Sequence, residues 1–508
     1  MIHNPIIRGF NPDPSICFAD GTYYVVTSTF EYFPGLPIWE SKDLVNWSYA
    51  GSVLTDEEHL DLTASENNQG LYAPTIRFHE GRFFVVCTNK FTHRNFVVSA
   101  PDIHGPWTKP AFIARDGIDP SLLFLEDGRC FYCSNGRDEQ GRQGIFGQFI
   151  DPMTGKLAGT MRLLTYGCGG HSVEGPHIYN LDNWYYLLVS EGGTGSGHHI
   201  CMLRSKDIFG PYAPGPHNPA LSHADRKGHE IQCTGHADLF LTDRNDWYAV
   251  FLATRTPMKT MGKNLGRETF LAPVAWKDGW PVVGHDGFVE LQMAGGYAQM
   301  EDRSDLSVPF DRPLAGFPFL KVRVPASDRY RLDPETKTLT LEGTCPIGRH
   351  LGHPTLLGLR QPEFVTDYEV KLDLSSLEEM AGIAVYHNSN YFYAVTVENE
   401  GGLVRVSLDR QIHGVQVRTE SILLDRTRTL ALGIHSDRQW YTFTVDGIQL
   451  SKAAIYGMST SASFDGSFTG TLYAIWSAYG KATFLDGISL HAQEDDWVQP
   501  VLTPGSWI

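Results

Sequence analysis

Three short segments carry the side chains that stand out chemically in this sequence. Asp13 lies in "GFNPDPSI", Asp119 lies in "GIDPSLLF", and Glu174 opens "EGPHIY". Taken singly, each aspartate is explained as a turn residue before proline, because Asp-Pro is a frequent turn dipeptide. Glu174 alone is equally explained as an exposed carboxylate at the end of a strand. The similar sequences that follow the three acids argue instead for matched places in the fold.

Three carboxyls gathered in one cavity would be an expensive arrangement, because like charges at close range raise one another's pKa. Inverting glycoside hydrolysis uses such an arrangement directly. It needs a protonated acid on the leaving oxygen and an ionised base that activates water on the opposite face of the sugar. A third carboxylate beside the acid would help to keep it protonated near neutral pH.

Five predicted hairpins would have to position these acids. Short aromatic or β-branched runs, such as "GTYYVVTST" and "NWYYLLVSE", follow a turn five times, and another short apolar run precedes each of them. Runs of this length bounded by Gly, Asn and Asp predict strands. The upstream strands begin 46 to 62 residues apart, at Asp13, Ala73, Asp119, Glu174 and His236.

Repeats of this kind are typical of propeller blades, in which each unit carries several strands and insertions lengthen some units. The sequence therefore predicts a five-bladed β-propeller. Because the innermost strand of each blade lines the central channel, we expect Asp13, Asp119, Glu174 and His236 to lie at one end of a shared cavity.

A second domain is predicted where the hairpin repeat stops. A Pro-rich stretch, "VPFDRPLAGFPFLKVRVP", follows the last repeat, and the boundary is placed between residues 310 and 311, giving domains 1–310 and 311–508. Beyond it, "YEVKLDL" and "WYTFTVDG" alternate apolar and polar residues, as strands do when one face is buried. We expect a β-sandwich packed on the propeller, and thus an all-β protein.

The bulk composition excludes several function classes. A net charge of −17 over 508 residues disfavours nucleic-acid partners and anionic membranes. The sequence shows neither an apolar stretch of membrane-spanning length nor the features of a signal peptide at its start, so a cytoplasmic location is expected. The eight cysteines do not form a dense disulfide framework, and most of them, such as Cys201, are interpreted as buried free thiols. The oligomeric state stays open, and a homo-oligomer is compatible with the sequence.

The segments "NPDPS", "DPSL" and "EGPH", in this order, resemble glycoside hydrolase family 43. Together with "STFEYFPG", "GHADLF", the five hairpins and the appended sandwich, they resemble its two-domain β-xylosidase and α-L-arabinofuranosidase branch over essentially the whole chain. The resemblance implies an exo-acting, inverting glycosidase that needs no cofactor. It would release terminal xylose from short β-1,4-xylo-oligosaccharides and arabinose as well, with α-L-arabinofuranosidase as the alternative main activity. A non-catalytic glycan-binding protein is the alternative from another class.

The resemblance also implies roles for the three acids. Asp13 matches the general base, Glu174 matches the general acid, and Asp119 matches the residue that orients the acid and tunes its pKa. A glycan-binding protein would need neither an acid nor a base at matched blade positions, and these residues argue against that alternative.

Two further polar residues match the family pattern. His236 corresponds to a histidine on the propeller axis, which in some members binds a calcium ion through water; a packed core histidine is the alternative. Arg267 in "LGRETF" resembles the arginine that contacts the sugar in the deepest subsite, whereas simple pairing with an acid such as Glu268 is the alternative.

Three aromatic residues are predicted to shape the pocket. Phe30 matches an aromatic wall of the deepest subsite, although a plain core position explains it nearly as well. Tyr72 lies in "YAP" where many relatives have "WAP", a departure that makes the pocket shape less certain. Phe468 in "GSFTG" is expected to reach the active site from the second domain.

Overall fold

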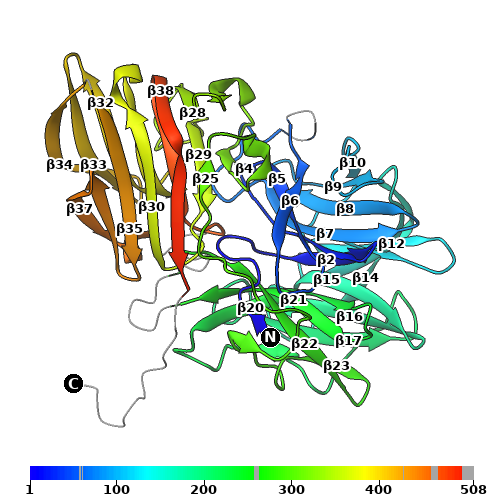
Figure 1. The fold of residues 1–508 in the computed structure, drawn as a ribbon. Helices are drawn as coiled ribbons and strands as arrows, with labels where there is room; N and C mark the ends of the chain where they lie inside the picture. Colours follow the sequence, from blue (N-terminus) through cyan, green and yellow to red (C-terminus); the bar gives the residue numbers. More distant parts are fainter. Residues whose placement is uncertain (57–58, 60, 257–262, 427, 459–466, 495–508) are drawn as a thin grey trace, which may run out of the picture.

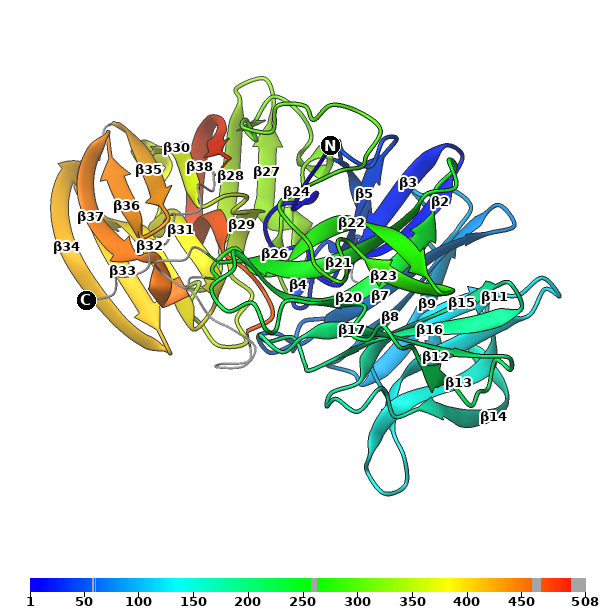
Figure 2. The ribbon, with the colours of Figure 1, turned by 90° about the horizontal axis from the view of Figure 1, so that it is seen from below.

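The fold consists of five small antiparallel sheets around a common axis and a larger two-sheet domain beside them (Figures 1 and 2). The computed structural model describes residues 1–494 except for 57–58, 60, 257–262, 427 and 459–466. The predicted fold class is confirmed: the protein is all-β, with a five-bladed propeller followed by a β-sandwich. Among the described residues, no helix has the length and apolar character needed to cross a membrane.

The five blades follow one another along the chain, and each runs from an inner to an outer strand. The first blade consists of β2 (Ser15–Ala19), β3 (Thr22–Val26), β5 (Gly35–Ser41) and β6 (Ser48–Leu54), and the second of β7 (Leu71–His79), β8 (Arg82–Asn89), β9 (Arg94–Ala100) and β10 (Ala111–Ile113). The third consists of β11 (Ser121–Phe124), β12 (Cys130–Arg137), β13 (Gln143–Asp151) and β14 (Lys156–Thr165), and the fourth of β15 (Glu174–Leu181), β16 (Trp184–Glu191), β17 (His199–Ser205) and β18 (Ala213–Pro214), with β19 (Leu221–Ser222) beside β17. The fifth consists of β20 (Ile231–Leu241), β21 (Trp247–Arg255), β22 (Glu268–Lys277) and β23 (Trp280–Val283).

Tight turns fix the register of the inner hairpins. Asp20 and Gly21 connect β2 to β3 with φ angles of 49° and 79°, and Asp182 and Asn183 connect β15 to β16 with 50° and 62°. Positive φ at both central residues is the requirement of the two-residue turn that matches strand twist, and Asp-Gly satisfies it well. The buried aromatic and β-branched runs are thereby held against the neighbouring blades.

The N-terminal segment closes the ring. β1 (Ile2–His3) pairs with β24 (Gln292–Met293), which follows the last blade. The side chain of Asn4 donates to the carbonyl of Leu271 at 2.9 Å and accepts from its N–H at 2.8 Å. The start of the chain, which leads directly to Asp13, is therefore bound to the fifth blade.

One long strand, β38 (Leu472–Gln493), is shared by both sheets of the second domain. Its first half pairs with β29 and β31, where Ile475 lies opposite Ile383, and its second half pairs with β28 and β30, where Phe484 lies opposite Leu372. The other strands are β29 (Thr355–Arg360), β31 (Met380–Asn388), β32 (Tyr391–Glu400), β33 (Leu403–Ile412) and β34 (Val415–Asp425) in one sheet, and β25 (Val308–Pro309), β27 (Tyr330–Asp333), β28 (Thr338–Gly343), β30 (Val365–Asp373), β35 (Thr429–Asp437), β36 (Trp440–Val445) and β37 (Ile448–Ala454) in the other. Short 3-10 helices are η1 (Leu314–Gly316), η2 (Ser327–Arg329), η3 (Leu374–Ser376) and η4 (Ile455–Met458).

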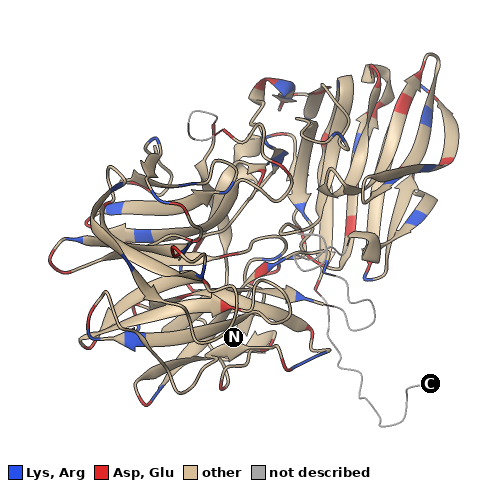
Figure 3. Cartoon of the chain, turned by 180° about the vertical axis from the view of Figure 1, so that it is seen from behind, with Lys and Arg blue, Asp and Glu red and all other residues tan. Residues whose placement is uncertain are grey.

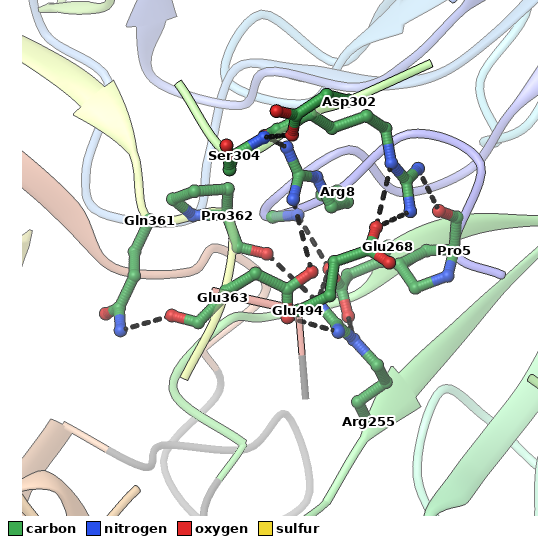
Figure 4. Close-up of polar contacts among 12 residues, drawn as sticks. Pro5, Arg8, Arg255, Glu268, Asp302, Ser304, Gln361, Pro362, Glu363 and Glu494 are labelled. Carbon is green, nitrogen blue, oxygen red and sulfur yellow. Dashed lines mark hydrogen bonds and ion pairs between the residues drawn. The ribbon is translucent and has the colours of Figure 1, made fainter. Parts of the chain in front are cut away.

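The two domains interlock through backbone pairing and buried charges. β26 (Lys321–Val322) pairs with β4 (Tyr32–Phe33) of the first blade. Figure 4 shows Arg255 between two carboxylates: its guanidinium donates to Glu268 at 2.7 and 2.9 Å and to Glu363 of the second domain at 2.5 Å. All three side chains are nearly fully buried. Since breaking a buried ion pair costs about 3–5 kcal/mol, this contact strongly favours one orientation of the domains.

Charged side chains of both signs are interspersed along the loops and outer strands of both domains (Figure 3). That nucleic acid is not a partner stays a prediction, based on the net charge of −17.

Candidate active site

A cavity of about 350 Å³ lies at one end of the propeller axis. The structure brings together around it all eight residues that the sequence singled out: Asp13, Phe30, Tyr72, Asp119, Glu174, His236, Arg267 and Phe468. The five inner strands, or the residues just before them, and one segment of the second domain therefore converge on one pocket.

The backbone has a positive φ at the matched position of four blades and, in the fourth blade, one residue after the matched Glu174. The φ angle is 55° at Asp13, 24° at Ala73, 56° at Asp119, 58° at Gly175 and 49° at His236. Non-glycine residues seldom adopt positive φ, and each such residue costs on the order of 1–3 kcal/mol. Strain of this kind persists where the surrounding structure imposes it, and it clusters at functional sites. The recurrence supports the alignment of four blades made from the sequence and shifts the fourth by one residue, from Glu174 to Gly175.

Asp13 is held as an ionised carboxylate. Ser28 Oγ donates to its Oδ2 at 2.6 Å, Arg267 Nη1 donates to its Oδ1 at 3.1 Å, and His236 Nδ1 lies 3.8 Å from Oδ1. Burial alone would raise the pKa of Asp13, but the attraction of Arg267 and His236 and the hydrogen bond from Ser28 outweigh burial and lower it. This acid is therefore suited to accept a proton from water.

Glu174 is in the opposite electrostatic state. Burial raises its pKa well above the usual value, and the negative charges of Asp119 and Asp13 raise it further against the opposing effect of Arg267. Its Oε1 lies 4.0 Å from Nε2 of His198. A carboxyl that stays protonated in a pocket open to a ligand can serve as a proton donor.

Asp119 has a raised pKa, as Glu174 does, but the rise is smaller. Its Oδ2 accepts a hydrogen bond from the N–H of Gly175 at 3.1 Å, so it contacts the backbone directly after Glu174. Burial raises the pKa of Asp119, His236 opposes this, and the charge of Asp13 adds to the rise. Environments that push neighbouring carboxyls in opposite directions are what acid and base assignments require.

Arg267 is fixed from three sides at the bottom of the pocket. Besides Asp13, its guanidinium donates to Thr194 Oγ1 at 3.1 Å and to the carbonyl oxygen of Phe468 at 3.1 Å. The alternative pairing with Glu268 is wrong, because Glu268 binds Arg255 instead. Consecutive residues in extended backbone point to opposite faces, which separates Arg267 from Glu268.

Three aromatic rings form one wall of the pocket. Phe30 and Phe468 stack with centroids 5.7 Å apart, and Tyr72 meets both edge-on at 5.0 and 5.8 Å. The N–H of Phe468 donates to Asn68 Oδ1 at 2.9 Å, which fastens the second domain to the rim. Phe30 also packs on Phe10, so both interpretations of this residue, pocket wall and core, hold.

The sequence analysis missed a glycine-rich loop that lines the pocket. Residues 192–199, "GGTGSGHH", follow β16 and contribute Thr194 and His198. His198 Nδ1 pairs with the carbonyl of Cys233 at 3.3 Å, so the bond assigns the proton to Nδ1. Burial, together with the charge of His236, lowers the pKa of His198 to about 3. A glycine-rich run directly after a strand was the available signal.

A second polar cluster fills the channel below the pocket and was also missed. Arg77 donates to Asp238 at 2.7 and 3.2 Å, and Ser15 and Tyr179 donate to the same carboxylate at 2.6 and 2.8 Å. Burial would raise the pKa of Asp238, but Arg77 and the other partners lower it to about 2. With Ser121 and His177, this channel cluster takes side chains from all five inner strands.

The described residues contain one group of three or more side chains arranged for metal binding, namely Cys168, Glu191 and Cys201. His236 is outside that group. Calcium bound to His236 through water, which the resemblance implied, stays a prediction.

Two family descriptions match the chain. The description "Glycosyl hydrolases family 43" matches residues 2–281, and "Beta xylosidase C-terminal Concanavalin A-like domain" matches residues 307–483. The first covers more than half of the sequence and includes the predicted acid, base and pKa-tuning residues.

Characterised relatives are similar over nearly their full length. The chain is 36% identical over 492 residues to the non-reducing end alpha-L-arabinofuranosidase BoGH43B of Bacteroides ovatus, covering 94% of this chain and 91% of that protein. It is 34% identical to the xylosidase/arabinosidase of Butyrivibrio fibrisolvens, covering 82% of this chain and 84% of that protein.

Solved structures show the same architecture. The crystal structure of xylan beta-1,4-xylosidase from Bacillus halodurans C-125 superposes with a TM-score of 0.89 at 28% identity, covering 97% of this chain and all of that one. The structure from Bacteroides ovatus titled "Xyloglucan PUL GH43B" gives 0.89 at 34% identity, covering 97% of this chain and all of that one. With its propeller, its acidic pocket and its second domain, the protein is a glycoside hydrolase and belongs to family 43.

Proposed function

We propose that the protein is an exo-acting, inverting glycosidase that releases terminal xylose from short β-1,4-xylo-oligosaccharides. The observation that carries the proposal is the opposite electrostatic state of Asp13 and Glu174 in one pocket. The pocket also offers an aromatic wall and a fixed arginine, which suit the apolar face and the hydroxyls of a sugar.

The proposed reaction is a single displacement. Asp13 takes a proton from a water molecule while the oxygen of that water attacks the anomeric carbon. Glu174 gives its proton to the departing glycosidic oxygen. One C–O bond forms while another breaks on the opposite face, so the configuration inverts. Asp119 keeps Glu174 protonated through its charge.

The shape of the pocket supports exo action. The wall formed by Phe30, Tyr72 and Phe468 closes one side, and Arg267 occupies the bottom. A cavity of about 350 Å³ suits one terminal sugar and its linkage rather than the middle of a polymer.

α-L-Arabinofuranosidase as the main activity is the second candidate. The relative from Bacteroides ovatus, at 36% identity, is named for that activity, whereas other relatives are named as xylosidases. The two sugars present similar hydroxyl layouts, so the same site can accept both. A pocket that satisfies each hydroxyl with a buried partner discriminates against the sugar that leaves one partner unpaired.

The first experiment compares kcat/KM for aryl β-D-xyloside, aryl α-L-arabinofuranoside and xylobiose. We expect turnover of all three, with the xylosides preferred. A preference for the arabinofuranoside would make the second candidate the main activity. No turnover of any of them, or of other xylo- and arabino-oligosaccharides, would favour the glycan-binding alternative.

The second experiment tests the stereochemistry. Proton NMR of the first-formed sugar should show the anomeric configuration opposite to that of the substrate. In a structure with sugar bound, the carboxyls of Asp13 and Glu174 should lie roughly 6.5–9.5 Å apart, leaving room for water. Product with the substrate's configuration would contradict the proposed mechanism. Cytoplasmic location and oligomeric state stay predictions, which fractionation and light scattering can test.

A further inference from the structure

Two thiols and a buried carboxylate meet behind the pocket rim. The ligand atoms of Cys168, Glu191 and Cys201 all lie within 4.8 Å of one another. Cys168 lies in the segment between β14 and β15, whereas Glu191 ends β16 and Cys201 lies in β17. The interpretation of the cysteines as buried thiols holds for Cys201 but not for Cys168, which is half-exposed.

The side chain of Glu191 is only 1% exposed, and hydrogen bonds hold its carboxylate in place. It accepts hydrogen bonds from the backbone N–H groups of Cys168 and, at 2.8 Å, Gly170. Its Oε2 lies 3.7 Å from Nε2 of His199. The carboxylate thus faces one imidazole and two thiols.

The orientation of His199 suits a metal ligand. Its Nδ1 pairs with the carbonyl of Gly197 at 2.8 Å, which leaves Nε2 to face Glu191. Metal-binding histidines typically donate their other N–H to a carbonyl or carboxylate in this way.

The two thiols are also positioned by neighbouring groups. Asn218 Nδ2 donates to Cys168 Sγ at 3.4 Å. The Cys168 and Cys201 ligand atoms lie within 4.8 Å of each other and of the Glu191 carboxylate. Because Cys168 is partly exposed, a cation has an entry path to the buried donors.

From this geometry we propose that Cys168, Cys201, Glu191 and His199 form a binding site for a thiophilic divalent cation of the Zn²⁺ class. Two sulfur atoms, one imidazole nitrogen and one carboxylate oxygen are the donors that such ions prefer, and four of them satisfy a tetrahedral ion. Zn–S bonds of about 2.3 Å place two sulfurs about 3.8 Å apart, so Cys168 and Cys201, whose sulfurs lie within 4.8 Å, need to approach by no more than about 1 Å. His199 lies outside this group of three and would have to turn from its place beside Glu191 toward the ion.

Occupation of this site would fasten the pocket rim. The segment that carries Cys168 continues through His171 and Ser172, which line the pocket, to Glu174. The backbone of His171 is already bound to Gly192 at 2.8 Å. A cation would add a bridge from this segment to β16 and β17.

The test uses the full-length protein, reduced with a phosphine and titrated with Co²⁺. We expect one Co²⁺ per chain, with thiolate-to-cobalt charge-transfer absorption and the strong visible bands of a tetrahedral site. Cys168→Ser and Cys201→Ser should each remove the charge-transfer contribution of one sulfur and weaken binding at least tenfold. Cys345→Ser, in the second domain, is the matched control and should bind as the original protein does.

A second measurement does not depend on spectroscopy. Stoichiometric Zn²⁺ should raise the thermal midpoint of the original protein and of Cys345→Ser, but not that of Cys168→Ser. Cys168 is half-exposed, so this variant should fold even where Cys201→Ser does not. Binding that lacks sulfur bands, that is equal in Cys168→Ser, or that is absent at one equivalent would overturn the proposal.

Discussion

Two layers of side chains lie along the propeller axis, and they treat buried charge in opposite ways. The pocket layer contains three carboxyls and leaves two of them with raised pKa values. The channel cluster below it pairs its carboxylate, Asp238, with Arg77 and two hydroxyls. Both layers come from the same five strands.

The two layers are only two residues apart in the sequence. Asp119 precedes Ser121 by two positions, and His236 precedes Asp238 by two. The pocket residue has a positive φ, and the channel residue follows two positions later, so each of these chain segments supplies both layers. In the channel cluster the buried carboxylate is paired with a buried cation, and this layer holds the blades together. In the pocket layer two carboxyls lack such a cation, and this is the layer that does chemistry.

The largest expected effect is that of Asp13→Ala. No other group is proposed to activate the water, so kcat should fall by about 10⁴-fold, the upper end of what acid–base catalysis contributes. Steady-state kinetics on xylobiose and an aryl xyloside measure it. Asp43→Ala is the matched control, since Asp43 only caps a turn of the same blade through the N–H groups of Val45 and Asn46. Loss of activity in the control, or retention in Asp13→Ala, would contradict the assignment of the base.

Glu174→Ala should show a loss that depends on the leaving group. A leaving group that departs readily as its anion needs little protonation, whereas xylobiose needs a proton donor. We expect kcat/KM for xylobiose to fall by about 10²–10⁴-fold, and for an aryl xyloside with an acidic phenol to fall far less. Equal losses on both substrates would show that Glu174 is not the acid.

Asp238→Ala should act on stability rather than on chemistry. It leaves Arg77 buried without its carboxylate, which costs about 3–5 kcal/mol in the free energy of unfolding. Urea denaturation measures it, with Asp119→Asn as the matched control that removes a charge from the pocket layer and should cost much less. A similar loss in both variants would abolish the distinction between the layers.

The pH dependence of stability carries the same contrast. The pKa of Asp238 in the folded state is about 2, below its unfolded value of roughly 3.9, so its pairing stabilises the protein above that value. This contribution is lost as the pH falls from about 4 through 2. The original protein should therefore lose more stability over this range than Asp238→Ala does.

The smallest expected effect is that of Asp119→Asn on the pH profile. Its negative charge raises the pKa of Glu174, so removing the charge lowers that pKa and moves the alkaline limb of the kcat profile to lower pH. Turnover should fall more than substrate affinity. The apparent values belong to the interacting carboxyls as a group. An alkaline limb that stays in place while turnover falls would mean that Asp119 only positions the acid.

Much of the pocket could be predicted because it follows from the repeat. Matching the blades by their hairpins placed Asp13, Asp119, Glu174 and His236 at equivalent strand starts without any distance information. The same matching contained the channel cluster, but Arg77 and Asp238 looked like ordinary strand residues. The ion pair of Arg77 and Asp238 depends on how two blades meet across the axis. The apolar–polar pattern within one strand does not predict contacts between blades.

The second domain shows the same limit. Alternating strands were evident, but the 22 residues of β38 serve two sheets at once, and alternation alone cannot say which neighbours a strand has. The proximity of Cys168 to Cys201 likewise depends on the path of an irregular segment. Phe468 was placed at the pocket by the family resemblance, not by any pattern in its own surroundings.

The bonds of Asp13 have a consequence for the order of events during synthesis. Asp13 leaves the ribosome well before Arg267, which binds its carboxylate and lies 254 positions later, and Phe468, which binds Arg267, lies a further 201 positions on. During synthesis the proposed base, Asp13, is therefore made early, whereas Arg267 and Phe468, which hold it in place, are made much later. Hydrolytic activity should appear only after Phe468 has been made, so a propeller without this segment of the second domain cannot act on sugars that it meets during translation.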